Sequence, residues 1–119
     1  MRDTRALVSV VDDDESVRES LPDLLAVCGY RARAFSSAEE FLASGFLGQT
    51  GCLILDVAMP GMSGPELQRE LASRSQSVPI VFITAHKDET EPLPGAVECL
   101  FKPFTESDLL EAVEKALAR

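Results

Sequence analysis

The 119-residue sequence predicts a single α/β domain, in which helices cover both faces of a parallel β-sheet. The main observation is that apolar segments of strand length alternate with segments of helical periodicity along the whole chain. The connections between them are short, and such alternation requires right-handed crossovers and therefore parallel strands. The length is typical of one domain with one complete core, so we expect residues 1–119 to form a single domain.

Five segments have the length and composition of strands. The segment 30–35 alternates Arg31 and Arg33 with Ala32 and Ala34, which predicts an edge strand with one face in water. The other four are nearly continuously apolar, as is typical of strands covered on both faces. They are residues 6–11, 52–55, 79–84 and 96–101.

Helix signals fall between these strands. Apolar residues recur at helical spacing from Val17 to Cys28, and Gly29 follows as a stop signal. Asp14 is expected to cap this helix, and Pro22 lies inside it and should bend it. Three further helices are predicted to begin at sequences with capping-box spacing, namely Ser37 to Glu40, Ser63 to Glu66 and Thr105 to Asp108.

The composition excludes several classes of protein. The formal net charge of −9 would repel nucleic acid and anionic membrane surfaces, so this chain alone should bind neither. No apolar run is long enough to span a bilayer, and the N-terminal residues do not resemble a signal peptide, which predicts a cytoplasmic protein. Cys28, Cys52 and Cys99 are widely and irregularly spaced, and we expect them to be reduced core residues.

Chemically active residues follow the predicted strands. Asp12 and Asp13 come after the first strand, and Asp56 closes the third. Thr84 ends the fourth strand, and Lys102 follows the fifth. Ligands of parallel α/β sheets bind beyond the carboxyl ends of the strands, so these side chains should meet. Together they could hold Mg²⁺ and a phosphoryl group, with the central aspartate attacking phosphorus.

Four motifs resemble those of the receiver domain of two-component response regulators. They are VVDDDESVRESL, LILDVAMPGMSGPEL, IVFITAH and LFKPF, and the resemblance covers essentially the whole chain. The segments SSAEEFLA and GCLILD are most like receivers that precede a LuxR-type helix-turn-helix domain. The resemblance implies a flavodoxin-like (CheY-like) three-layer sandwich whose five-stranded sheet has the order 2-1-3-4-5. It also implies a histidine kinase as phosphodonor in a Mg²⁺-dependent reaction.

The resemblance assigns roles around the acidic cluster. Asp56 would be the phosphoacceptor, and Asp12 and Asp13 would be the acidic pair of the metal site. Asp13 would bind Mg²⁺ directly, together with Asp56 and the backbone carbonyl of Ala58. Such a domain would be a signalling phosphoacceptor and not an enzyme, beyond catalysing its own phosphorylation and dephosphorylation.

The resemblance also covers the last two strands, where the sequence departs from it twice. Thr84 would be the switch hydroxyl, Lys102 the lysine of the site, and Lys102-Pro103 a cis peptide. Segment 86–94 (HKDETEPLP) lacks an apolar stripe and contains two prolines, so the fourth helix of the family is expected to be shortened or absent. Cys99 stands where the family usually has Tyr or Phe, and both departures predict an atypical output face.

Three other interpretations stay open at this point. The chain could be a receiver-fold interaction module that is not phosphorylated. It could be a haloacid-dehalogenase-type phosphatase with Asp12 as nucleophile, although Ser16 and the short chain fit that poorly. It could also be part of a longer regulator whose DNA-binding output domain lies beyond Arg119. The expected partners are accordingly a histidine kinase and either a C-terminal output domain or a second copy.

Overall fold

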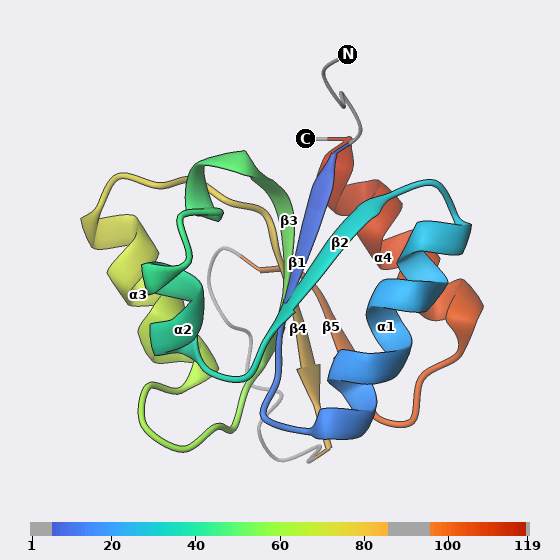
Figure 1. Cartoon of the computed structure of the whole chain (residues 1–119), viewed down its shortest axis with the longest axis horizontal. Helices are drawn as coiled ribbons and strands as arrows, with labels where there is room; N and C mark the ends of the chain where they lie inside the picture. Colours follow the sequence, from blue (N-terminus) through green and yellow to red (C-terminus); the bar gives the residue numbers. More distant parts are fainter. Residues whose placement is uncertain (1–5, 86–95, 119) are drawn as a thin grey trace.

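The computed structural model describes residues 6–85 and 96–118 and has three layers (Figure 1). A five-stranded parallel sheet of order β2-β1-β3-β4-β5 lies between two helical layers, which confirms the predicted flavodoxin-like topology. Helices α1 and α4 cover one face, and α2 and α3 cover the other (Figure 1). The strands are β1 (Leu7–Val11), β2 (Arg31–Phe35), β3 (Thr50–Asp56), β4 (Ile80–Thr84) and β5 (Ala96–Phe101). The helices are α1 (Glu15–Val27), α2 (Ala38–Ala43), the 3₁₀-helix η1 (Leu47–Gln49), α3 (Gly64–Ser73) and α4 (Glu106–Leu117).

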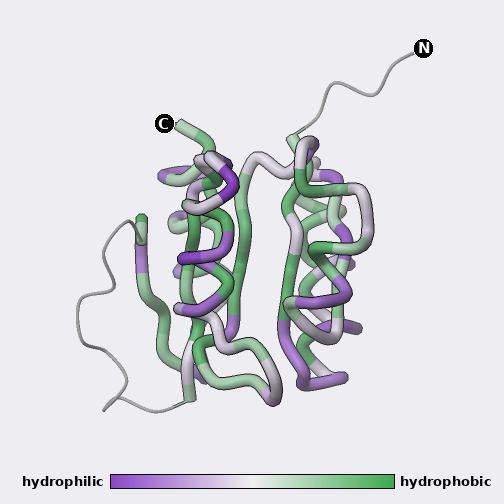
Figure 2. Tube along the Cα trace, turned by 90° about the vertical axis from the view of Figure 1, so that its left-hand side faces the viewer, coloured by the Kyte–Doolittle hydropathy of each residue, from purple (hydrophilic) through white to green (hydrophobic). Residues whose placement is uncertain are grey.

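The sheet divides the hydrophobic core into two parts, because successive side chains of a strand point to opposite faces. On β3, Cys52 and Ile54 pack toward α1 and α4, whereas Leu53 and Leu55 pack toward α2 and α3. Figure 2, which views the molecule from the α2 and α3 side, shows mostly hydrophobic strands and helices that carry most of the hydrophilic residues. The prediction that these central strands are covered on both faces is confirmed for β1, β3 and β4.

Both edge strands differ from the central ones. The prediction of an edge position for β2 is confirmed, and the guanidinium of Arg33 lies 4.3 Å from the ring centre of Phe46 on its exposed face. The prediction that β5 is covered on both faces is wrong. Its residues are half-buried and Phe101 is exposed, and in the described part of the chain β5 is an edge strand that pairs with β4 alone.

The helix caps follow the sequence signals closely. Asp14 caps α1 by accepting a hydrogen bond from the backbone of Ser16 at 2.9 Å, as predicted. Complete capping boxes begin α3 and α4, and Pro22 lies inside α1. At α2 only half of the predicted box forms. Ser37 accepts from the backbone of Glu40, whereas the Glu40 carboxylate bonds to the backbone and hydroxyl of Ser36.

The cysteines are not all core residues. Cys52 is buried in β3, and burial raises the pKa of its thiol to about 12, so it is unreactive near neutral pH. Cys99 is half-buried. The prediction is wrong for Cys28, which is exposed because α1 ends at Val27 and Cys28 forms its C-cap.

The fourth helix of the family is expected to be shortened or absent in segment 86–94. This segment lies between β4 and β5 and outside the described residues. The expectation therefore stays a prediction. None of the helices in residues 6–85 and 96–118 is long and apolar enough to cross a membrane.

A tight contact joins α3 to the end of β3 and yields a prediction. A Cβ on Gly64 would lie 2.5 Å from the backbone oxygen of Asp56, well inside van der Waals contact. Gly64→Ala should therefore destabilise the protein by about 2 kcal/mol, despite the better helix propensity of alanine. Urea unfolding of this variant and of Gly48→Ala, where a Cβ meets no atom within 4 Å, provides the measurement and its control. Equal stability of the two variants would contradict the contact.

Candidate functional site

The candidate site lies at the carboxyl ends of β1 and β3, toward the bottom of Figure 1. Asp12 and Asp13 follow β1, and Asp56 is the last residue of β3. Each of the three offers a carboxylate oxygen within 4.8 Å of those of the other two. The structure thus brings together the three acidic residues that the sequence singled out.

Asp12 is the buried member of this cluster, with 0% of its surface exposed. Its Oδ1 accepts from the backbone N–H of Asp14 at 2.9 Å, and its Oδ2 accepts from Nζ of Lys102 at 2.9 Å. Its backbone N–H donates to the carbonyl of Phe35 at the end of β2. Both carboxylate oxygens are therefore engaged within the protein, whereas Asp13 is exposed beside them.

Asp56 carries an abnormal carboxyl group. It is only 6% exposed, and its pKa is raised to about 7. Burial is the largest cause of the raised pKa, followed by the negative charge of Asp12, while Lys102 acts in the opposite direction. Near neutral pH the site thus holds more negative charge than its surroundings stabilise.

Lys102 supplies the positive charge opposite this cluster. Its side chain is 22% exposed. Burial lowers the pKa of its ammonium group, but the bond to Asp12 and the charges of Asp12 and Asp56 raise it more, so the net pKa is raised. The backbone N–H of Lys102 donates to the carbonyl of Thr84 at 2.8 Å, and the peptide bond to Pro103 is cis.

The other predicted site residues take different positions. Thr84 is buried at the end of β4. Its backbone carbonyl accepts a hydrogen bond from the backbone N–H of Lys102, which places Thr84 beside the site. Ala58 is exposed in the loop of residues 57–63 between β3 and α3, called the 57–63 loop below. Cys99 lies opposite Phe82 in the β4–β5 register and packs against the core on the α2 and α3 side.

Sequence reasoning missed Arg18 as part of the site. Its Nη1 donates to the backbone carbonyl of Asp12 at 3.1 Å, and its charge helps to lower the pKa of Glu40, after the hydrogen bonds from Ser36. Arg18 lies in the first turn of α1, where the helix dipole disfavours a cation. That unfavourable placement was the available signal that Arg18 has a local partner.

The donor set fits a hard divalent cation. Three carboxylate oxygens converge, and Mg²⁺ binds through one or two carboxylates while keeping several waters. The two bonds already made by Asp12 leave Asp13 and Asp56 as the more available ligands. A cation here would also offset the charge that raises the pKa of Asp56.

Comparison with known protein families shows which family has this combination of fold and acidic site. Residues 8–114 match the model of the response regulator receiver domain. The chain belongs to this family. Receiver domains are signalling phosphoacceptors of two-component systems, and the match therefore does not support the phosphatase interpretation.

Relatives of this receiver domain are about twice its length. The response regulator protein TmoT of Ectopseudomonas mendocina is 44% identical over 98% of this chain, which corresponds to 55% of TmoT. Nodulation protein W of Bradyrhizobium diazoefficiens is 45% identical over 98% of the chain and 53% of its own length. The transcriptional regulatory protein FixJ of Azorhizobium caulinodans is 40% identical over 94% of the chain and 55% of its own length. The chain thus spans about half the length of these relatives.

Solved structures show the same fold. The response regulator StyR matches with a TM-score of 0.90 and 48% identity, over 97% of this chain and 60% of StyR. The FixJ-N structure matches with a TM-score of 0.84 and 38% identity, over 100% of this chain and 97% of that one. Chemotaxis protein CheY4 of Vibrio cholerae matches with a TM-score of 0.84 and 31% identity, over 96% of this chain and 100% of that one.

Proposed function

We propose that this receiver domain accepts a phosphoryl group on Asp56 in a Mg²⁺-dependent reaction, with a histidine kinase as donor. The observation that carries the proposal is the convergence of the Asp12, Asp13 and Asp56 carboxylates within 4.8 Å beside the Lys102 ammonium. Two carboxylates facing a third, with one ammonium, form a site that can hold a cation and the anionic group it accompanies.

The proposed chemistry is a displacement at phosphorus. A carboxylate oxygen of Asp56 forms the new P–O bond while the P–N bond of the donor phosphohistidine breaks. The leaving imidazole keeps the electron pair and takes up a proton. Asp56 must be ionised to attack, and its pKa of about 7 means that burial first, and then the neighbouring charges, govern how much of it is ionised.

The residues around Asp56 have separate proposed roles. Asp13, Asp56 and the carbonyl of Ala58 would hold Mg²⁺, which when bound supplies positive charge to the phosphoryl oxygens. The Lys102 ammonium would move from Asp12 toward the phosphoryl group. The hydroxyl of Thr84, buried at the end of β4, would donate to a phosphoryl oxygen and so report the phosphorylated state.

The proposal extends to the organisation of the signalling protein. Residues 1–119 would form one receiver domain in the cytoplasm, and its output would pass to a C-terminal domain or to a second copy. Transcriptional regulatory proteins among relatives of about twice the length support an output domain. The half-buried Cys99 and the exposed Phe101 of β5 support the proposal that the output face differs from that of most receiver domains.

Intact mass measurement after incubation with Mg²⁺ and acetyl phosphate tests the phosphorylation. The wild type should gain one phosphoryl group, and Asp56→Asn should gain none, because the P–O bond forms on that carboxylate. Omitting Mg²⁺ should abolish the gain in the wild type. Equal labelling of wild type and Asp56→Asn would refute the assignment, and a wild type that is never labelled would favour a receiver-fold module that works without phosphorylation.

A further inference from the structure

We propose that Glu39 of α2 is a positioning residue for the metal site, because its carboxylate holds the 57–63 loop in place. This inference rests on the proposed function, since that loop carries the Ala58 carbonyl assigned to the metal. The observation that carries it is a bond between distant parts of the chain. Oε2 of Glu39 accepts from the backbone N–H of Met62 at 3.1 Å, across 23 residues of sequence.

Glu39 is well suited to hold a loop because its own backbone is fixed. It lies in the first turn of α2, between Ala38 and Phe41, both fully buried against the sheet. Ser37 caps the same turn. A carboxylate at a helix N-terminus is favourable with respect to the helix dipole, so the anchor does not strain α2.

The loop has a shape that receives this carboxylate. Gly61 has a φ of +75°, in the region that favours glycine. A Cβ at Gly61 would lie only 3.0 Å from Oε2 of Glu39, so the absence of a side chain makes room for the carboxylate. The hydrogen bond and the glycine are independent features of the loop that both accommodate Glu39.

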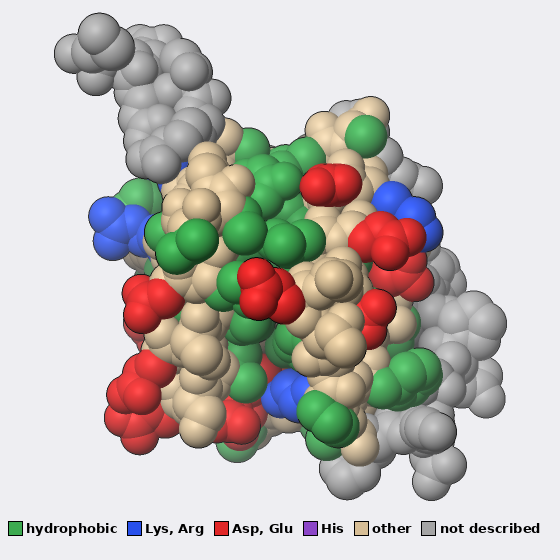
Figure 3. Space-filling model, turned by 90° about the vertical axis from the view of Figure 1, so that its right-hand side faces the viewer, with side chains coloured by type: hydrophobic (Ala, Val, Ile, Leu, Met, Phe, Trp, Pro, Cys, Tyr) green, Lys and Arg blue, Asp and Glu red, His purple; other side chains and the backbone are tan. Residues whose placement is uncertain are grey.

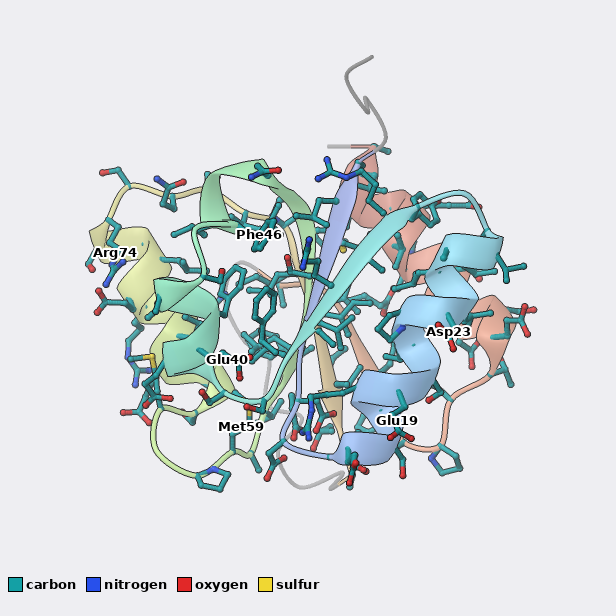
Figure 4. All side chains as sticks on the ribbon, in the orientation of Figure 1. Glu19, Asp23, Glu40, Phe46, Met59 and Arg74 are labelled. Atoms are coloured by element: carbon teal, nitrogen blue, oxygen red, sulfur yellow. The ribbon has the colours of Figure 1, made fainter. Side chains whose placement is uncertain are left out.

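The two ends of the loop tie it to Asp56. The backbone N–H of Val57 continues the β3–β4 ladder to Ile83, and the N–H of Gly64 closes the loop onto the carbonyl of Val57. Met59 and Met62 pack against the part of the core on the α2 and α3 side, and Met59 lies below α2 in Figure 4. Glu39 adds a polar anchor in the span that follows Ala58. Movement of this span would displace the Ala58 carbonyl relative to the Asp56 carboxylate.

Matched variants separate the hydrogen bond from the charge. Glu39→Ala should weaken Mg²⁺ binding by about three- to tenfold, because one hydrogen bond that orients a ligand loop is lost. Glu39→Gln keeps an acceptor oxygen and should bind Mg²⁺ within about twofold of the wild type. Glu19→Gln, on the exposed face of α1 (Figure 4), removes the same charge elsewhere and should match the wild type.

Mg²⁺ titration followed by backbone amide NMR gives the affinities, and urea unfolding gives the stability of each variant. Weakened Mg²⁺ binding in Glu39→Ala, with shifts at Ala58 to Met62 and rescue in Glu39→Gln, supports positioning. Unchanged affinity in Glu39→Ala, even with lower stability, overturns it, as does equal weakening in Glu39→Gln. A wild type that binds no Mg²⁺ refutes the proposed function instead, so the two failures are distinct.

Discussion

Asp56→Asn should stabilise the metal-free protein by about 2–4 kcal/mol near pH 8, although it removes the proposed phosphoacceptor. The carboxyl is only 6% exposed and faces Asp12, and its pKa of about 7 lies far above the ordinary 3.8. Above pH 7 the folded state must therefore keep a buried charge that the unfolded chain exposes to water. Asparagine has nearly the same shape and avoids that charge.

The pH dependence gives this prediction its direction. Between the ordinary pKa of 3.8 and the raised value of about 7, the folded state binds more protons at Asp56 than the unfolded state does. Wild-type stability therefore falls as the pH rises through this window, relative to Asp56→Asn. The advantage of the variant should be about two-fifths as large near pH 5 as near pH 8, and should level off above about pH 7.

Urea unfolding with EDTA, from about pH 5 to pH 8, measures this difference. Asp23→Asn, on the outer side of α1 (Figure 4), removes the same charge from an exposed position and should show little pH-dependent gain. A gain for Asp56→Asn that does not change with pH would contradict the raised pKa. Adding Mg²⁺ should narrow the difference, since a bound cation stabilises the wild-type carboxylates.

Much of the fold was predictable from local signals. Capping residues such as Asp14 and Ser63 act within a few residues of themselves, and the alternation of strands and helices fixes a parallel sheet. The exposure of β5 was less predictable, because an apolar strand has the same composition at an edge as at the centre. Whether one strand or two pair with it is a property of the whole sheet and not of the segment.

The site residues were predictable in position, since Asp12, Asp13 and Asp56 follow strands whose carboxyl ends meet. The contact of Glu39 was not, because it joins segments that the sequence leaves unrelated. Glu39 was part of a capping pattern, yet its partner lies 23 residues further along the chain. Unequal burial of Asp12 and Asp13 was also hidden, because adjacent residues at a strand end point in different directions.

Figure 3 shows the face of α1 and α4, where apolar side chains lie in the groove between the two helices. A pocket of about 380 Å³ lies at this face, between α1 and the turn from β5 into α4, and Lys102 lines it. Lys102 thus lines the pocket while its ammonium reaches Asp12. A change at Lys102 can therefore alter both packing and charge, and a test must separate them.

Lys102→Met should destabilise the protein by about 2–3 kcal/mol near pH 7, because it keeps most of the aliphatic stem and removes the partner of Asp12. Asp12 is fully buried, and breaking one side of such an ion pair leaves an uncompensated charge. The partial exposure of the Lys102 side chain, 22%, places the effect below that of a fully buried pair. The Asp12 and Asp56 carboxylates would then face each other without the ammonium group of Lys102.

Urea unfolding of double variants isolates the contribution of the Lys102 charge to the free energy of unfolding. Lys102→Met should cost much less in an Asp12→Asn background, because the unpaired carboxylate is gone. It should also cost less in an Asp56→Asn background, because one of the two repelling charges is removed. Additive losses in both backgrounds would mean that Lys102 stabilises the fold through its packing at the pocket alone. Non-additive losses would mean that Lys102 stabilises the buried carboxylates of the unphosphorylated domain. Movement of the ammonium toward a phosphoryl group would then require another positive charge to take its place beside Asp12.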